Sequence, residues 1–369
     1  MSILKISYKS FIIIPLTCVL ISVFVLSNNK KSKLSESDVT VKLGAYYFDG
    51  WTGIYPYHIT PALKKSFPER EPKWGWITSS QVIMNEQINL AANSGLSFFS
   101  FCWYYTGEKN YKKEPLNRSL GFYLNSPNIK KLQYNLLVAN HSGFEIGPDD
   151  WATVTYEWIS QFKSNSYLMV NGKPVITFFS LSSLVNKFKT VDKIREALIN
   201  LRQQAIKSGL KGVSIAIVLN PREKDIKLAE DCGFDVITGY NYHDAGLKSD
   251  KRVIPIDEMR KAEVAIWNQF SQLTRLPYMP VTTLNWDPRP WANSKNNYST
   301  ASYFKGFSGL SAYNSVLSCK NWIKRNSKNT VKEKIGIIYA WNEYGEGAYL
   351  TPTKKGMNPL KSIKKALKN

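Results

Sequence analysis

Two glutamates near the end of the sequence, Glu343 and Glu346, lie in the segment WNEYGEG (residues 341–347) together with glycines 345 and 347. Cleavage of a glycosidic bond requires an acid that protonates the leaving oxygen and a second carboxylate that assists at the sugar ring. At about 3.3 Å per extended residue, the two backbones lie at most ~10 Å apart, so the carboxyls could flank one bond. This spacing does not separate retaining from inverting chemistry, and two solvated loop glutamates would share it. We predict that Glu343 and Glu346 are catalytic.

Aromatic side chains and amide or carboxyl groups follow most of the short apolar runs that precede this segment. A sugar needs both, because its ring face stacks on aromatic rings while its hydroxyls require hydrogen bonds. The alternative is that these aromatics pack under loops. The predicted substrate-binding residues are Tyr46, Asp49, Trp51, Trp103, Tyr104, Asn140, His141, Tyr240, Tyr242, Asn285, Trp286, Trp341 and Asn342.

The elements that would position these residues alternate along the chain. Short apolar runs, typical of parallel strands covered on both faces, are separated by longer helical stretches. We expect strands at 43–48, 96–102, 133–139, 174–179, 213–219, 235–240, 279–284 and 335–340, and helices at 80–94, 115–125, 149–164, 191–208, 223–232, 257–275, 309–325 and 358–368. Eight strand–helix units predict an α/β fold of the (β/α)₈ TIM-barrel type, whose working face lies at the carboxyl ends of the strands. A doubly wound open sheet is the alternative, although no glycine-rich nucleotide loop follows the first strand.

The composition limits the classes of partner. The 369 residues include 49 basic and 28 acidic side chains, a net charge of +21. No zinc-finger spacing, aromatic–basic RNA motif or long arginine block is present, so we interpret the charge as a solvated lysine-rich surface and expect no nucleic-acid partner. An acidic polysaccharide or an anionic membrane face is the alternative. The scattered histidines and cysteines predict no metal site, no cofactor and no disulfide framework, and we expect a monomer.

An apolar leader precedes the predicted barrel. Residues 11–26 (FIIIPLTCVLISVFVL) carry no charge and follow Lys5 and Lys9, the layout of a secretory signal or a membrane anchor. We predict a signal peptide or membrane anchor at 1–27, a linker at 28–40 and a catalytic domain at 41–369. The protein is expected to be exported: periplasmic, extracellular, or membrane-anchored and facing away from the cytoplasm.

Six segments together resemble the glycoside hydrolase family 99-like proteins, which include endo-α-mannosidases and the WbsX-type proteins of polysaccharide gene clusters. They are GAYYFDGWTG, QINLAANSGLSFFSFCWYY, LLVANHSG, NGKPVITFF, TLNWDPRPW and WNEYGEGAYLTP. The resemblance spans nearly all of 41–369. It departs from the mannosidases at Tyr344-Gly345, where they have Trp-His, and from WbsX-type proteins at Thr351, where they usually have an acidic residue.

The resemblance implies an endo-acting, retaining glycoside hydrolase for α-linked, mannan-like or other polysaccharides. Glu343 matches the base that takes the proton of the sugar 2-hydroxyl, giving a 1,2-anhydro intermediate, and Glu346 matches the acid that protonates the leaving group. These roles require Glu343 to be ionised and Glu346 protonated at the start. Tyr46, Asn140 and His141 match positions that contact substrate. The alternatives are a glycosyltransferase or transglycosylase of surface-polysaccharide synthesis and a non-catalytic carbohydrate-binding barrel.

Overall fold

The computed structural model describes residues 39–248 and 251–368. The predicted signal peptide or anchor, and all but the last two residues of the predicted linker, therefore lie outside the described residues. Within the described part, no helix is both long and apolar enough to span a membrane.

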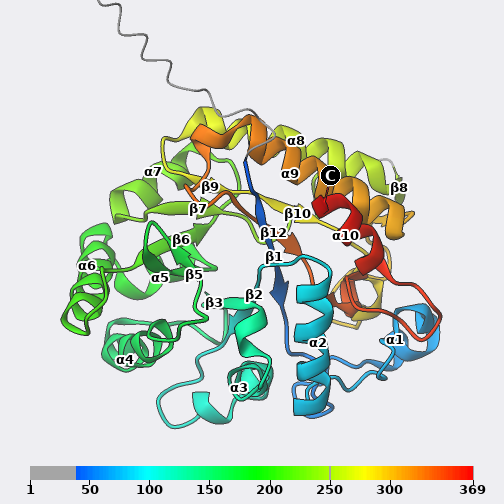
Figure 1. Cartoon of the computed structure of the whole chain (residues 1–369), viewed down its shortest axis with the longest axis horizontal. Helices are drawn as coiled ribbons and strands as arrows, with labels where there is room; N and C mark the ends of the chain where they lie inside the picture. Colours follow the sequence, from blue (N-terminus) through cyan, green and yellow to red (C-terminus); the bar gives the residue numbers. More distant parts are fainter. Residues whose placement is uncertain (1–38, 249–250, 369) are drawn as a thin grey trace, which may run out of the picture.

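Parallel strands form a ring in the middle of the molecule (Figure 1). The ring consists of β1 (Lys42–Tyr47), β2 (Phe98–Trp103), β3 (Gln133–Val138), β5 (Lys173–Phe178), β6 (Ser214–Val218), β7 (Val236–Thr238), β9 (Tyr278–Met279), β10 (Val281–Thr283) and β12 (Ile335–Tyr339). Each of these strands pairs with the next along the chain except β9 with β10, and β12 pairs with β1, for example Lys42 with Ile335.

The strands β9 and β10 are two halves of the seventh position in the ring. Pro280 separates them, and proline has no amide hydrogen to donate to a ladder. On one side β9 pairs with β7, and on the other β10 pairs with β12. The ring therefore has eight strand positions, and the predicted (β/α)₈ barrel is confirmed.

Helices surround the strands in chain order (Figure 1). They are α1 (Pro61–Ser66), α2 (Gln81–Asn93), α3 (Arg118–Leu124), α4 (Trp151–Phe162), α5 (Leu181–Phe188), α6 (Val191–Lys207), α7 (Glu223–Cys232), α8 (Ile256–Leu273), α9 (Gly309–Arg325) and α10 (Pro359–Lys368). Several begin at the hydroxyl caps that favour helix starts: Ser80, Ser180, Thr190 and Ser308 each accept a hydrogen bond from a first-turn amide.

The sequence did not predict the shortest elements. Helices α1 and α5 were missed, as were β4 (Met169–Val170) and the two-stranded pair of β8 (Val253–Pro255) with β11 (Tyr303–Lys305). The strands β4, β8 and β11 have two or three residues each, and a run of that length has no measurable periodicity. Most of these elements lie in the long connections between barrel strands.

Candidate active site

Both predicted catalytic carboxyls lie in a tight turn that follows the last barrel strand. After β12 the chain forms β13 (Asn342–Glu343), a 3₁₀ turn (Tyr344–Glu346) and β14 (Ala348–Tyr349), and β13 pairs antiparallel with β14. This is the carboxyl end of a barrel strand, where active sites of this fold lie. The turn therefore presents two carboxyls at the working face.

The two carboxyls are held by two tyrosines that touch each other. The Tyr240 hydroxyl donates a hydrogen bond of 3.3 Å to Glu343 Oε1, and the Tyr339 hydroxyl donates to Glu346 Oε2. The rings of Tyr240 and Tyr339 meet edge to face with centroids 4.8 Å apart. Glu343 is buried, with 5% of its surface exposed, and it is close enough to Glu346 for their charges to repel. The carboxyls therefore converge on one region.

Burial favours the neutral form of both carboxyls. Burial and then the charge of Glu346 raise the pKa of Glu343 well above its ordinary value, against the hydrogen bond from Tyr240. Burial raises the pKa of Glu346 to about 7, against the hydrogen bond from Tyr339 and the charge of Arg70. Such a pair titrates as a unit and holds one shared proton over part of the pH range. The arrangement that the resemblance implies requires that proton on Glu346 and an ionised Glu343.

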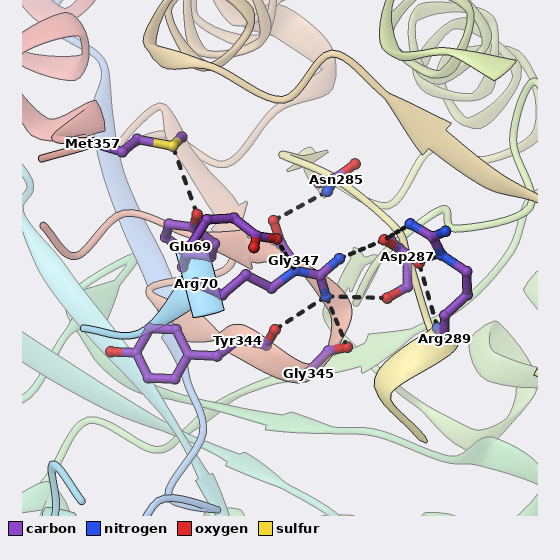
Figure 2. A network of polar contacts seen from close by, with 10 residues as sticks. Glu69, Arg70, Asn285, Asp287, Arg289, Tyr344, Gly345, Gly347 and Met357 are labelled. Carbon is purple, nitrogen blue, oxygen red and sulfur yellow. Dashed lines mark hydrogen bonds and ion pairs between the residues drawn. The ribbon is translucent and has the colours of Figure 1, made fainter. Parts of the chain in front are cut away.

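A buried arginine supports the turn from below. Arg70 Nη1 donates to the carbonyls of Tyr344 at 3.3 Å and Gly345 at 3.2 Å, and Nη2 forms an ion pair with the Asp287 carboxylate. Arg289 binds the same carboxylate at 2.7 and 2.8 Å. Figure 2 shows the Arg70 guanidinium between Asp287 and the two carbonyls. Arg70 thus joins the turn to the loop after β10.

The two glycines of WNEYGEG are required by this close packing. A Cβ on Gly345 would lie 1.9 Å from Trp291 Cζ2. Gly347 has a φ of +69°, and a Cβ there would lie 2.7 Å from Asn285 Nδ2 and 3.1 Å from Arg70 Cζ. No side chain fits at either position without a rearrangement of the turn.

Four of the predicted substrate-binding residues lie around the carboxyl pair. Tyr240 binds Glu343 directly and packs on Tyr46, whose hydroxyl donates to the Gly239 carbonyl at 2.6 Å. Tyr104 is close enough to Glu343 for the carboxylate to raise its pKa, after the larger effect of burial. His141 packs edge to face on Tyr104 with centroids 6.0 Å apart.

A cavity of about 440 Å³ opens beside this group. It lies at the carboxyl ends of β5, β6 and β7, and its lining includes Tyr240, Phe179, Asn220, Asn241 and His243. Such a space, with aromatic and amide groups in its wall, has the chemistry that a sugar requires.

Six other predicted binding residues hold the barrel rim together instead of facing this cavity. The Asn140 side chain bonds the backbone of Phe179 and Ser180, and the Asn342 side chain clasps both backbone groups of Phe48. Trp51, Trp103, Trp341 and Tyr242 are buried in the core. The indole groups of Trp51 and Trp341 and the hydroxyl of Tyr242 form hydrogen bonds with other protein groups. For these residues the structure shows packing and contacts within the protein, the open alternative; sugar contact by them stays a prediction.

The last three predicted binding residues also lie apart from the pair. Asp49 accepts hydrogen bonds from the Ser79 hydroxyl at 3.1 Å and the Ser119 amide at 2.6 Å, and burial raises its pKa to about 7. Trp286 packs in a second apolar cluster, and Asn285 donates to the Gly347 carbonyl at 3.2 Å. Asn285 thus binds the residue that follows the turn carrying Glu343 and Glu346.

Three residues that contact the pair or its turn were not predicted. Tyr339 is the last residue of β12 and was read as strand interior. Trp291 packs on Gly345 and stabilises charged Glu346 by a hydrogen bond, and Arg70 is more than 270 positions away from the turn it binds. Of the three, only Trp291 lies in a motif that the sequence analysis quoted: it is the last residue of TLNWDPRPW. Among the described residues, no group of three or more His, Cys, Asp or Glu side chains could hold a metal ion.

Fold and site together define a (β/α)₈ barrel with a buried carboxyl pair on its last strand. A protein-family model described as glycosyltransferase WbsX matches residues 75–361. This chain belongs to the WbsX family. No curated protein sequence matches the chain.

Solved structures share the barrel at low sequence identity. The endo-alpha-mannosidase of glycoside hydrolase family 99 from Bacteroides thetaiotaomicron superposes with a TM-score of 0.59 at 11% identity, covering 89% of this chain and 96% of that one. A glycoside hydrolase-like protein superposes with a TM-score of 0.63 at 14% identity, covering 89% and 94%. These similarities establish a common fold and confirm the predicted resemblance to the family 99-like and WbsX-like group.

Proposed function

We propose that this protein is a glycoside hydrolase that cleaves α-linked glycans within the chain and retains the anomeric configuration. The observation that carries the proposal is the pair of buried carboxyls, Glu343 and Glu346, bound to two touching tyrosines at the carboxyl end of a barrel strand. Glycoside cleavage uses such a pair, one carboxyl as acid and one as base or nucleophile. The shared barrel fold of the family 99 endo-α-mannosidase supports the choice of substrate class.

In the first step, Glu343 removes the proton of the sugar 2-hydroxyl. The freed oxygen attacks the anomeric carbon, and the bond from that carbon to the leaving oxygen breaks. Glu346 gives its proton to the leaving oxygen. The product of this step is a 1,2-anhydro sugar, with Glu343 neutral and Glu346 ionised.

In the second step, water opens the 1,2-anhydro ring at the anomeric carbon. Glu346 accepts a proton from the water, and Glu343 returns its proton to the 2-oxygen as the strained bond breaks. Two inversions at one carbon give net retention, and both carboxyls recover their starting states.

The proposed roles need the shared proton on Glu346 and an ionised Glu343, whereas burial raises the pKa of both carboxyls. A bound sugar corrects this, because its 2-hydroxyl would donate to Glu343 and so stabilise the ionised form. Only part of the free enzyme then carries the productive arrangement, and substrate binding increases that part.

Replacement of either carboxyl tests the assignment. Glu343→Gln and Glu346→Gln should each lower kcat on polysaccharide by about 10²- to 10⁴-fold, since each removes one proton-transfer group. The measurement is reducing-sugar release from α-mannans and rhamnose-containing polysaccharides. Glu108→Gln, an exposed glutamate in the loop after β2, is the matched control and should retain normal activity. Normal turnover by Glu346→Gln would refute the assignment.

A transferase is the second candidate, because the family description names a glycosyltransferase. The same anhydro intermediate could pass to a sugar hydroxyl instead of water. Product analysis with water alone and with added sugar acceptors or nucleotide sugars separates the two functions. Free oligosaccharides in water alone support the hydrolase, whereas products that form only with an added acceptor or nucleotide sugar support the transferase.

A further inference from the structure

A second cavity, of about 580 Å³, lies outside the carboxyl site. It is formed by the loop between β1 and α1 and by the segment that precedes α2. We call it the aromatic groove and define it by Tyr57, His58, Lys64, Trp74 and Trp76, which line it together with glycines and isoleucines. Lys64 supplies the ammonium group of the lining, and no carboxylate takes part.

Exposed apolar side chains gather at this groove. Tyr55 and Tyr57 are 76% and 70% exposed and pack on each other edge to face, with centroids 6.1 Å apart. Ile54 and Ile77 are exposed beside them. A contiguous exposed apolar patch on a soluble domain marks a binding surface, whereas single exposed apolar residues need no explanation.

The groove also has polar groups fixed in place around its rings. Trp74 Nε1 donates to Glu86 at 2.5 Å, and Lys73 lies over the same ring at 4.9 Å from its centroid. Burial lowers the pKa of His58, so its ring is neutral at neutral pH. Aromatic rings with few charges and polar edges suit a sugar, which has an apolar face and a hydroxyl rim.

The wall of the groove is continuous with the catalytic turn. Trp76 packs edge to face on Tyr344, centroids 6.4 Å apart, and Tyr344 lies between Glu343 and Glu346 in the turn. His58 packs on Trp291, centroids 5.7 Å apart, and Trp291 is the residue that packs against Gly345. Two rings that line the groove therefore contact the turn or the tryptophan packed against it, so the groove lies next to the turn that carries the carboxyls.

We propose that the aromatic groove is a carbohydrate-binding subsite that holds sugar units of the substrate chain away from the cleaved linkage. The proposal rests on the proposed function and deepens it, because endo action on a polymer requires grip on units beyond the scissile bond. Sugar rings stack on Tyr57 and Trp74, and Lys64 donates to their oxygens. A protein partner is the other occupant that such a patch could have.

The test is affinity electrophoresis of the full chain carrying Glu346→Gln, so that nothing is cleaved. The gels contain soluble yeast α-mannan or a neutral rhamnose-containing polysaccharide, because neutral polymers avoid non-specific retention by the net charge of +21. Adding Tyr57→Ala or Trp74→Ala should weaken the apparent affinity about three- to tenfold, as expected for loss of one stacking ring. Tyr156→Ala is the matched control, since Tyr156 is 78% exposed and lines a different cavity between α4 and α6.

Equal retention of the Tyr57→Ala chain and its parent would overturn the proposal. The proposal also fails if neither glycan retains the parent, which is the result expected if a protein occupies the groove. Trp74 is half-buried, so its variant is checked by circular dichroism, while exposed Tyr57 carries the test by itself. The readout is separate from catalysis: retention with no sugar release by the unaltered chain would leave the subsite standing and refute the hydrolase.

Discussion

At the scale of single residues, the hydroxyl of Tyr240 lowers the pKa of Glu343 and so opposes the effect of burial, which raises it. It donates to Glu343 Oε1 and so favours the ionised carboxylate, which the proposed mechanism requires as its base. Tyr339 does the same for Glu346, whose proton the mechanism requires. One tyrosine therefore supports the proposed proton arrangement and the other opposes it, so the two hydroxyls set the balance of a shared proton.

Tyr240→Phe should move the pH optimum of kcat/KM to higher pH and lower its maximum. Loss of the hydrogen bond raises the pKa of Glu343 further, so a higher pH is needed to ionise the base. The measurement is kcat/KM on polysaccharide against pH for both proteins, with Tyr156→Phe as the control. An optimum that stays in place, or moves to lower pH, would contradict the role of Glu343 as base.

At this scale the sequence pointed to the carboxyl pair but could not separate residues that contact sugar from residues that pack within the protein. The structure brings Glu343 and Glu346 together in one glycine-framed turn, as expected from their spacing. The predicted rim residues Trp51, Asn140 and Asn342 instead bind backbone groups. Aromatic and amide side chains at a strand end have the same pattern whether they face a sugar or brace a loop, so sequence cannot separate the two.

At the scale of elements, the turn that carries Glu343 and Glu346 depends on a contact with a segment distant in the sequence. Arg70 follows α1, and its buried guanidinium binds the turn and the Asp287 carboxylate. This contact could not be predicted from the sequence, because a lone arginine more than 200 positions from its carboxylate has no local pattern. Such long-range polar contacts appear only once the barrel brings its loops to one face.

Arg70→Met should lower the free energy of unfolding by about 3 kcal/mol, the typical cost of removing one partner from a buried ion pair. The Asp287 carboxylate would keep only Arg289, and the carbonyls of Tyr344 and Gly345 would lose their donor. Urea denaturation measures the change. Arg222→Met removes an exposed ion pair and should change the free energy by less than about 1 kcal/mol. Equal midpoints for Arg70→Met and the unaltered protein would show that the contact does not support the turn.

At the scale of the whole molecule, a buried carboxyl outside the pair should set part of the pH dependence of stability. Glu263 in α8 is fully buried and accepts hydrogen bonds from the Thr283 amide at 2.7 Å and the Thr282 hydroxyl at 3.2 Å. Burial raises its pKa to about 8. The folded protein therefore binds this proton more tightly than the unfolded chain does.

Because the folded pKa is raised, the contribution of Glu263 to stability is complete below the unfolded pKa of about 4.5 and is lost as the pH rises to about 8. Glu263→Gln removes this loss. The free energy of unfolding of the variant minus that of the unaltered protein should increase with pH across this window, by at most about 1.4 kcal/mol per pH unit. Urea denaturation at several pH values measures it, and a difference independent of pH would contradict the assignment.

The barrel itself was predictable because its strands are short apolar runs with longer helices between them, and each such unit has a pattern of its own. The division of the seventh strand at Pro280 was less visible, since both halves belong to a single run of sequence. The prediction from sequence missed the short helices α1 and α5 and the strand pair β8–β11. Their places follow from contacts that no local pattern encodes.

The strand that precedes the catalytic turn, β12, is also the one that joins the two ends of the ring, through β1 on one side and β10 on the other. A growing chain therefore gains its reactive groups and closes its barrel in a single late event. A chain that stops before residue 335 would have an open sheet and no carboxyl pair. If the protein hydrolyses glycans, a nascent chain that has not reached residue 335 lacks both carboxyls and cannot cleave them.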